Sequence, residues 1–210
     1  MFNKLINYFN YKEKQLRSSR IIFTTMLITS ALGLLAAFVL SIEAIELLKN
    51  PNAQLSCSIN AVINCATVAQ TSYSSLLGFP NSFIGMMVMP VFVVVSIAGL
   101  YGVKFPSQFM FAVQIVAFSA LLFAFYLFHI SIVIIQVLCP WCLLVDVTTI
   151  IMFFALTRYN VSVDNLYLSK KYVILAKNFI KKDYDKFSAA LLIVAGAVII
   201  VAKFGSSLFA

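Results

Sequence analysis

Charged side chains are scarce in this chain. Of its 210 residues, 10% are charged and 62% are hydrophobic, whereas a soluble globular domain carries about 25% charged residues. This scarcity excludes an ordinary soluble domain and indicates a membrane protein. The net charge of +8 forms no basic stripe with interleaved aromatic residues, so it does not predict binding to nucleic acid.

Other expected features are also missing. His129 is the single histidine and lies deep in an apolar stretch, where we interpret it as a packing or interfacial residue rather than a proton relay. The first apolar run is too long for the hydrophobic region of a signal peptide, and no small-residue cleavage site follows it. We therefore expect this run to be retained as a membrane span.

What the sequence does contain is five apolar runs. A helix needs about 20 residues to cross roughly 30 Å of hydrocarbon, and most of the runs approach or exceed that length. The fifth run is short, so of the five it is the one that least clearly meets the length needed to span a membrane. The sequence predicts an all-α polytopic membrane protein with spans at residues 21–41, 83–103, 109–137, from about 139 to about 156, and 187–201.

Basic residues are sorted by segment. Apart from Lys49 and Lys203, every Lys and Arg lies before the first run, between the fourth and fifth runs, or at Lys104. The positive-inside rule then places these segments in the cytoplasm and the loop after the first run outside. We expect a basic N-terminal segment (1–20), a bundle (21–158) with an outer loop (42–82), a basic linker (159–186), and a fifth span with an outer C-terminus (187–210).

The four cysteines form two pairs that this topology places on the outer side. Cys57 and Cys65 lie in the polar loop, and Cys139 and Cys142 open the fourth run in the sequence Cys-Pro-Trp-Cys. Cysteines three residues apart share one face of a helix, and a helix N-terminus favours the thiolate, the nucleophile of thiol–disulfide exchange. Two dithiols on one surface indicate an electron relay, in a compartment that is oxidising in bacteria.

Two other uses of the cysteines have to be weighed. The C-x-x-C pair is also half of a zinc site, and a Cys57–Cys65 disulfide could simply hold the loop together. The single histidine argues against zinc, and the second pair on the same surface argues against a purely structural bond. We expect no metal. The alternative is a non-catalytic membrane protein with structural or metal-binding cysteines.

The combination of motifs resembles the vitamin K epoxide reductase family. The resemblance is carried by C-x7-C in the first loop, by Gly-Phe-Pro-Asn-Ser at residues 78–82, and by C-P-W-C at the fourth run, over roughly residues 21–156. It implies a four-helix transmembrane bundle around a quinone, with the fifth helix beside it. The other family of quinone-linked disulfide generators carries the two cysteine motifs in the reverse order.

The resemblance also implies a function. Bacterial members of the family oxidise thiol partners at the expense of quinone, either ubiquinone or menaquinone. We expect an enzyme of the bacterial inner membrane, with its active site on the outer face, that reoxidises a DsbA-like partner and promotes disulfide formation. Bacterial members often continue into a fused thioredoxin-like domain, whereas this chain ends at Ala210, so we expect a separate soluble thioredoxin-like partner. The same residues could instead reduce disulfides on the outer side, but the redox poise of the quinone pool favours oxidation of thiols.

Roles for the four cysteines follow from the resemblance. Cys142 matches the cysteine that passes electrons to quinone, and Cys139 matches the one that exchanges with the loop pair. Cys57 matches the loop cysteine that exchanges with Cys139. Cys65 matches the one that reacts with the partner.

Polar residues complete the expected site. Asn81 matches a polar residue near the quinone carbonyl, and Thr71 or Ser72 matches a hydroxyl residue that recurs after the second loop cysteine. Asp146 lies one turn after Cys142, where vertebrate members have a tyrosine. An ionisable group inside a span usually faces a cavity or the bundle interior. Asp146 is therefore either a proton source for quinone reduction or a packing residue that bonds to a neighbouring polar group.

Overall fold

Helices make up almost all of the computed structural model, which describes the backbone of residues 2–208 and the side chains of residues 18–205. Within that part of the chain no β-strand forms, so the predicted all-α class is confirmed. The elements are α1 (Phe2–Lys49), α2 (Cys65–Ala69), the 3₁₀ turn η1 (Ser72–Ser75), α3 (Ser82–Leu100), α4 (Ser107–His129), the π-helical turn η2 (Ile130–Ile135), α5 (Pro140–Ser162), α6 (Lys170–Lys181) and α7 (Tyr184–Leu208).

Five helical stretches among the described residues are long and apolar enough to cross a membrane, as predicted. They cover Ser18–Lys49, Ser82–Leu100, Ser107–Ile135, Pro140–Ser162 and Tyr184–Gly205. The chain is therefore a multi-pass membrane protein. Side chains of residues 1–17, which make up most of the expected basic segment 1–20, lie outside the described residues.

Two membrane-spanning helices extend beyond the apolar runs that predicted them. The first helix continues well beyond residue 41 and ends at Lys49, because Pro51 disfavours helix in the residue before it and nothing earlier breaks the helix. The fifth span, expected to be short, is 22 residues long. It begins with the polar residues Tyr184, Asp185 and Lys186. Hydropathy does not mark these residues as part of a membrane span, although their backbone is helical.

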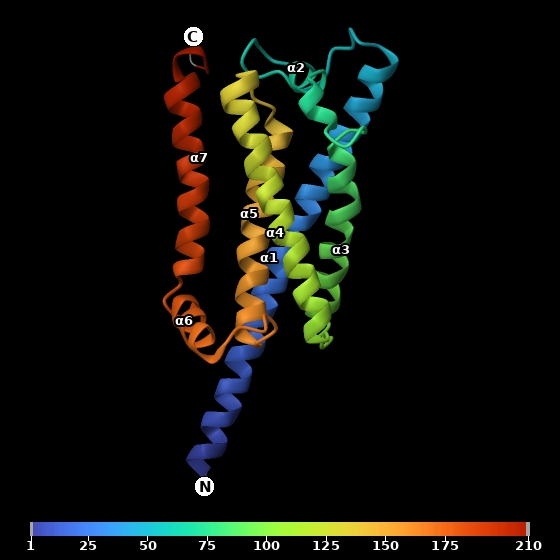
Figure 1. Ribbon diagram of the computed structural model, residues 1–210. Helices are drawn as coiled ribbons and strands as arrows, with labels where there is room; N and C mark the ends of the chain where they lie inside the picture. Colours follow the sequence, from blue (N-terminus) through green and yellow to red (C-terminus); the bar gives the residue numbers. More distant parts are fainter. Residues whose placement is uncertain (1, 209–210) are drawn as a thin grey trace.

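The helix α1 occupies the middle of the bundle and packs against both α3 and α5, while α4 packs against α5 (Figure 1). Small residues allow the close approach of α1 and α3. A Cβ added to Gly85 would lie 2.8 Å from the Cβ of Ala37, and one added to Gly99 would collide with the ring of Phe23. Such small residues are how membrane helices gain packing contacts, because lipid offers no hydrophobic drive between helices.

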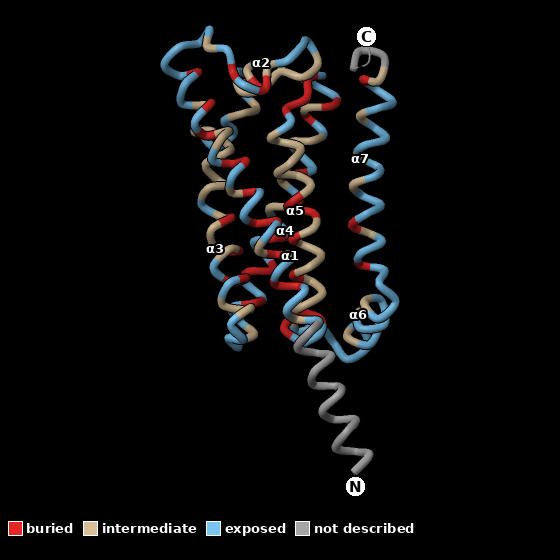
Figure 2. The backbone as a smooth tube through the Cα atoms, turned by 180° about the vertical axis from the view of Figure 1, so that it is seen from behind, coloured by how far each residue is buried: buried red, intermediate tan, exposed pale blue. Residues whose placement is uncertain are grey.

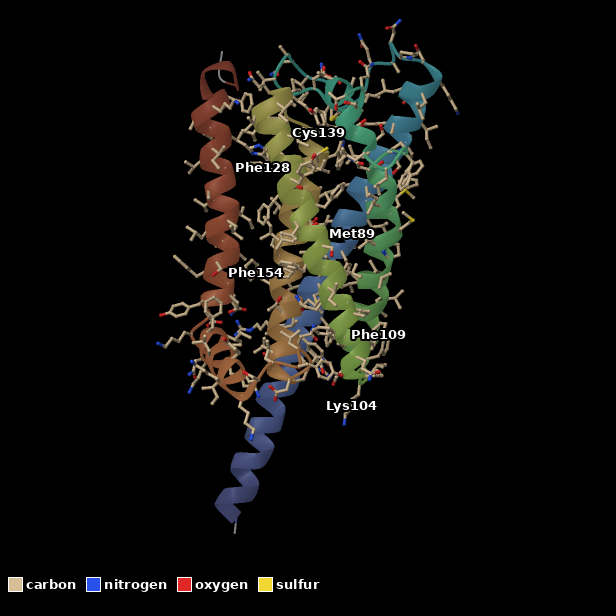
Figure 3. The ribbon with its side chains drawn as sticks, in the orientation of Figure 1. Met89, Lys104, Phe109, Phe128, Cys139 and Phe154 are labelled. Carbon is tan, nitrogen blue, oxygen red and sulfur yellow. A yellow bond between two sulfur atoms is a disulfide. The ribbon has the colours of Figure 1, made fainter. Side chains whose placement is uncertain are left out.

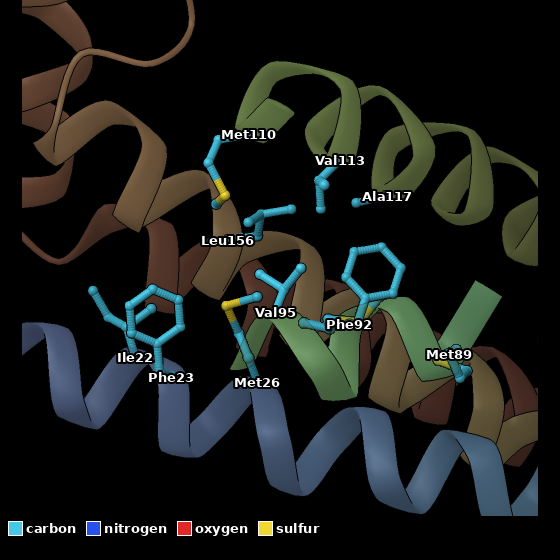
Figure 4. Close-up of a cluster of buried hydrophobic side chains, with 11 residues drawn as sticks. Ile22, Phe23, Met26, Met89, Phe92, Val95, Met110, Val113, Ala117 and Leu156 are labelled. Atoms are coloured by element: carbon cyan, nitrogen blue, oxygen red, sulfur yellow. The ribbon is translucent and has the colours of Figure 1, made fainter. Parts of the chain in front are cut away.

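The main core lies between α1, α3, α4 and α5. Its fully buried members include Met26, Phe92, Met110, Met152 and Leu156, and the side chains interdigitate across the four helices (Figure 4). Exposed positions lie on the outward helix faces (Figure 2). Many of them are large and apolar, as a lipid-facing surface requires; they include Ile28, Leu35, Val94, Phe118 and Leu122.

A polar network joins α4 to α5 within this core. The Asn160 side chain donates from Nδ2 to Oε1 of Gln114 (2.9 Å), and Gln114 donates from Nε2 to Oγ1 of Thr157 (2.9 Å). The Nδ2 of Asn165 donates to Oδ1 of Asn160 (3.1 Å). Interhelical hydrogen bonds of this kind contribute about 0.6 kcal/mol each in membranes, so the network specifies how α4 and α5 pair.

The last helix, α7, stands to one side and is joined to the bundle through α6 (Figure 1). Near its start, Arg158 of α5 bonds to Asp185 through Nη1 (2.8 Å) and to Asp183 through Nη2 (2.9 Å). Near its end, Lys203 donates from Nζ to the carbonyl of Ile132. The pKa of Asp183 lies below its usual range, because its carboxylate accepts hydrogen bonds from Lys186 and Arg158. Polar contacts thus attach a helix whose apolar packing is sparse.

Removing the charge of Arg158 should loosen α7. Its side chain is 19% exposed and that of Asp185 is 5% exposed, so Arg158→Gln leaves a buried carboxylate unpaired, at a cost of roughly 3 kcal/mol. The matched control is Lys177→Gln, which breaks a pair whose side chains are 44% and 53% exposed and should cost about 0–1 kcal/mol. Unfolding in mixed micelles, followed by circular dichroism, measures both. Equal losses would contradict this role for Arg158.

Candidate redox site

Both cysteine pairs lie at one end of the bundle, which we call the cysteine end. Residues 50–81, with α2 and η1, form a loop over this end. Cys139 lies beneath that loop, whereas Lys104 lies at the opposite end (Figure 3). The chain's two dithiols are therefore brought together by the way the helices pack.

A short parallel β-bridge between Ile63 and Leu138 joins the loop to the segment before α5. The N–H of Asn64 donates to the carbonyl of Leu138 (3.0 Å), and the N–H of Leu138 donates to the carbonyl of Val62 (2.7 Å). Asn64 and Leu138 each directly precede a cysteine. Two backbone hydrogen bonds therefore hold Cys65 beside Cys139.

Local sequence determines the backbone of both segments that the β-bridge joins, the loop before Cys65 and the turn before Cys139. Asn64 caps α2, since its Oδ1 accepts hydrogen bonds from the N–H of Thr67 and the hydroxyl of Ser58, both at 3.0 Å. Gln136 has a left-handed backbone (φ 57°), which turns the chain sharply between η2 and α5. Pro140 occupies the first turn of α5, where its missing N–H costs little.

The four sulfur atoms form a continuous series. Cys57 and Cys65 are joined in a disulfide with their Cα atoms 5.6 Å apart. The Sγ of Cys65 lies 3.5 Å from the Sγ of Cys139, which lies 2.7 Å from the Sγ of Cys142. Cys139 also accepts a hydrogen bond from the N–H of Cys142 (3.3 Å). Thiol–disulfide exchange passes between neighbouring sulfurs, so this series can carry electrons along its length.

The loop sulfur that contacts Cys139 is not the one expected from the resemblance. The resemblance led us to assign Cys57 to Cys139 and Cys65 to the partner, but the sulfur that contacts Cys139 is that of Cys65. Cys57 instead contacts the carboxylate of Glu43. Spacing alone could not distinguish the two, because the β-bridge that places Cys65 joins segments more than 70 residues apart in the chain.

Glu43 was missed by the sequence analysis. Glu43 is 6% exposed. Its Oε2 lies 3.4 Å from the Sγ of Cys57, and its Oε1 accepts a hydrogen bond from the hydroxyl of Ser56 (2.9 Å). The sequence feature that could have indicated Glu43 is its position: it is an acidic residue directly after the first apolar run, with no helix-breaking residue between them. Ending the first span at residue 41 assigned Glu43 to the loop instead.

The polar residues that the resemblance singles out in the loop are Asn81, expected near the quinone carbonyl, and Thr71 or Ser72, the match of the recurring hydroxyl residue. Asn81 donates from Nδ2 to the carbonyl of Tyr73 (2.7 Å) and accepts at Oδ1 from the N–H of Leu76 (3.2 Å), so its amide holds the loop in shape. Thr71 likewise donates to the carbonyl of Val68 (2.8 Å). Ser72 begins η1. None of these contacts involves a sulfur atom.

Asp146 lies one turn beyond Cys142 on α5 and is partly buried. Its carboxylate hydrogen-bonds to no described residue, so the packing bond considered from the sequence does not form there. His129, at the end of α4, is exposed. Of these two ionisable groups, only Asp146 lies close to the reactive sulfurs.

The surroundings of Cys142 fit a quinone. Quinone sites are largely apolar with a few polar groups, and Cys142 is partly buried among apolar side chains that include Leu40 and Trp141. Asp146, one turn further along α5, is the residue that would supply a polar group there. By contrast, the three potential metal ligands Glu43, Cys57 and Cys65, whose ligand atoms lie within 4.8 Å of one another, do not suit a metal here, because the two sulfurs are bonded to each other.

A bundle of membrane-spanning helices with a disulfide next to a C-x-x-C dithiol defines a membrane thiol oxidoreductase. Comparison with protein families identifies which one: the model of the vitamin K epoxide reductase family matches residues 24–157, and the chain belongs to this family. The match covers the four spans that surround the sulfur series. Membership indicates a disulfide oxidoreductase, in a family that uses quinone. No match was found among curated proteins.

The order of the sulfurs can be trapped in double variants. In Cys57→Ser/Cys142→Ser, the remaining Cys65 and Cys139 should form a disulfide readily, because their sulfurs already lie 3.5 Å apart. In Cys65→Ser/Cys142→Ser, the remaining Cys57 and Cys139 should do so much more slowly. Mass spectrometry of peptides after mild oxidation measures both. Faster bonding in the second variant would reverse the assignment.

Proposed function

We propose that this protein is a quinone-dependent thiol oxidase of the bacterial inner membrane, with its N-terminus in the cytoplasm and the cysteine end outside. It reoxidises a separate soluble thioredoxin-like (DsbA-like) partner and so promotes disulfide formation. The observation that carries the proposal is the series of four sulfurs, which leads from the surface loop to the partly buried Cys142 on α5. A purely structural disulfide would have no need of a dithiol against it.

The first half of the cycle takes electrons from the partner. A partner thiolate attacks the Sγ of Cys57, forms a mixed disulfide, and releases Cys65 as a thiolate. Cys65 then attacks Cys139 in an oxidised Cys139–Cys142 pair, so that the Cys65–Cys139 bond forms and Cys142 leaves as a thiolate. The short distance between Cys65 and Cys139 supports this order.

The second half restores the loop disulfide. The second thiolate of the partner attacks the mixed disulfide, so the oxidised partner departs and Cys57 is freed. Cys57 attacks Cys65, the Cys65–Cys139 bond breaks, and the Cys57–Cys65 bond forms again. Cys139 and Cys142 are then both reduced, which is the combination present in the structure. A quinone beside Cys142 would supply the acceptor for the two electrons that the pair gives up on closing.

The loop offers a place for the partner. A hollow of about 380 Å³ on the loop surface is lined by Ala53, Gln54, Ser58, Ile59, Asn60, Asn64 and Ala66. Ser58 is the neighbour of Cys57, so a partner segment lying in the hollow would be next to the sulfur it attacks. The lining is uncharged and combines amide and hydroxyl groups with small or apolar side chains, which suits hydrogen bonding to an extended backbone rather than recognition of charge.

Cys142→Ala should abolish catalytic turnover. Without the last sulfur, electrons have no route to quinone, whereas the loop disulfide can still react once with a reduced partner. Quinone reduction by the purified protein in detergent, driven by a reduced thioredoxin-like protein, measures turnover, and alkylation of the released thiols measures the single exchange. His129→Gln is the control and should turn over normally. Retained turnover in Cys142→Ala would exclude the proposed route, and failure of the wild-type protein with several partners and quinones would favour a structural role for the cysteines.

Asp146→Asn should slow quinone reduction while leaving partner exchange unchanged. A positioned acid contributes about 10²–10⁴-fold to a proton-transfer step, and reduction of quinone consumes two protons. Asp146→Glu keeps the carboxyl group and should recover part of the rate. Comparing steady-state quinone reduction with the single exchange separates the two steps. An equal effect of Asp146→Asn on both would indicate that Asp146 acts only through packing.

A further inference from the structure

Glu43 is placed where the proposed chemistry needs an acid or base. Both of its carboxylate oxygens contact the Sγ of Cys57, at 3.4 and 3.6 Å. The residue is only 6% exposed, and Ser56 holds one oxygen through a 2.9 Å hydrogen bond. A buried carboxylate in an apolar helix is costly and is seldom kept without a function.

The loop itself contains no substitute for Glu43. Between Asn50 and Asn81 the sequence has no Asp, Glu, His, Lys or Arg, and α3 has none along its whole length. On α1 the nearest carboxylate is that of Glu46, one turn away and exposed. The other ionisable groups that face this region are Cys139 at the start of α5 and Cys142 and Asp146 of α5, and none of the hydrogen bonds of the described residues joins them to Cys57.

We propose that Glu43 transfers the proton of Cys57 during thiol–disulfide exchange. This inference rests on the proposed function, and it assigns to Glu43 a catalytic role that family membership does not specify. Cys57 is the sulfur that reacts with the partner. Glu43 is therefore the acid and base of the partner-facing step, whereas Asp146 lies near the quinone-facing step.

The proton follows the sulfur through two steps. When the oxidised partner departs, the bond between Cys57 and the partner breaks, and the Cys57 thiolate takes a proton from the Glu43 carboxylic acid. When Cys57 attacks Cys65, the Cys57–Cys65 bond forms, the Cys65–Cys139 bond breaks, and the Cys57 proton returns to the Glu43 carboxylate. Cys139 leaves as a thiolate. The pair of Glu43 and Cys57 is therefore neutral while Cys57 is in a disulfide and carries a single negative charge while Cys57 is a thiol, which avoids two adjacent anions in a buried site.

Exchange at the loop disulfide can be measured without quinone or a protein partner. In a Cys139→Ser/Cys142→Ser background, dithiothreitol opens the Cys57–Cys65 bond and oxidised dithiothreitol closes it, and alkylation after a quench reports the rates. Glu43→Gln should slow closure about a hundredfold near neutral pH, the lower end of the range for a positioned base. The deficit should shrink as the pH rises, because Cys57 then loses its proton to solvent.

Two variants separate proton transfer from a structural role. Glu46→Gln makes the same change one turn away on an exposed position, where its charge acts on Glu43 only through space, and should alter the rate and its pH profile far less than Glu43→Gln. Ser56→Ala removes the hydrogen bond to Glu43 but keeps the carboxylate beside Cys57, so it should slow closure far less than Glu43→Gln. Correct folding of Glu43→Gln is checked by the Cys65–Cys139 disulfide, which should still form when Cys57 and Cys142 are serines.

The outcomes distinguish this inference from the proposed function. A Glu43→Gln rate that is unchanged, faster, or slowed equally at every pH would overturn proton transfer by Glu43, even if the wild-type protein oxidises its partner normally. Conversely, a pH-dependent deficit in Glu43→Gln together with no quinone reduction by the wild-type protein would support the role of Glu43 while the proposed function fails.

Discussion

Two backbone hydrogen bonds to Leu138 are the constraint on which the site depends. They connect Val62 and Asn64 of the loop to the segment before α5, one residue ahead of Cys65 and Cys139. Backbone bonds fix the main chain beside the two cysteines, so only rotation of the cysteine side chains decides whether the two sulfurs are in contact. Without the bridge, a loop of polar and small residues would have little reason to stay over the bundle.

The long first helix serves both the fold and the chemistry. Its first half packs Phe23 and Met26 into the main core, and its last turns rise beyond the apolar core to place Glu43 against Cys57. A base carried by a rigid helix is held more accurately than one on a flexible loop. The same helix packs against α3 and α5, so the group that handles protons and the helix that carries Cys139 and Cys142 are held in one rigid arrangement.

The bundle and the last helix are stabilised differently. The four spans matched by the family model share a close-packed core and a buried amide network, whereas α7 is attached mainly by Arg158 at one end and Lys203 at the other. None of the sulfur contacts among the described residues involves α7. Phe204 of α7 nonetheless packs in one apolar cluster with Leu138 and Val62, whose backbones hold the loop to the bundle, so α7 supports the geometry of the sulfurs indirectly.

Hydropathy, charge and the cysteine motifs were enough to predict the all-α class, the five spans and the two redox pairs, because these depend on local composition. The start of α5 at Pro140 followed from the same local rules. The full lengths of the first and fifth spans did not follow from the apolar runs, since polar residues such as Glu43 and Asp185 can be helical when neighbouring groups satisfy them. Only the tertiary structure decided that Cys65 rather than Cys57 meets Cys139 and that Glu43 lies at Cys57, because pairing between distant segments depends on how the helices pack and leaves no local pattern in the sequence.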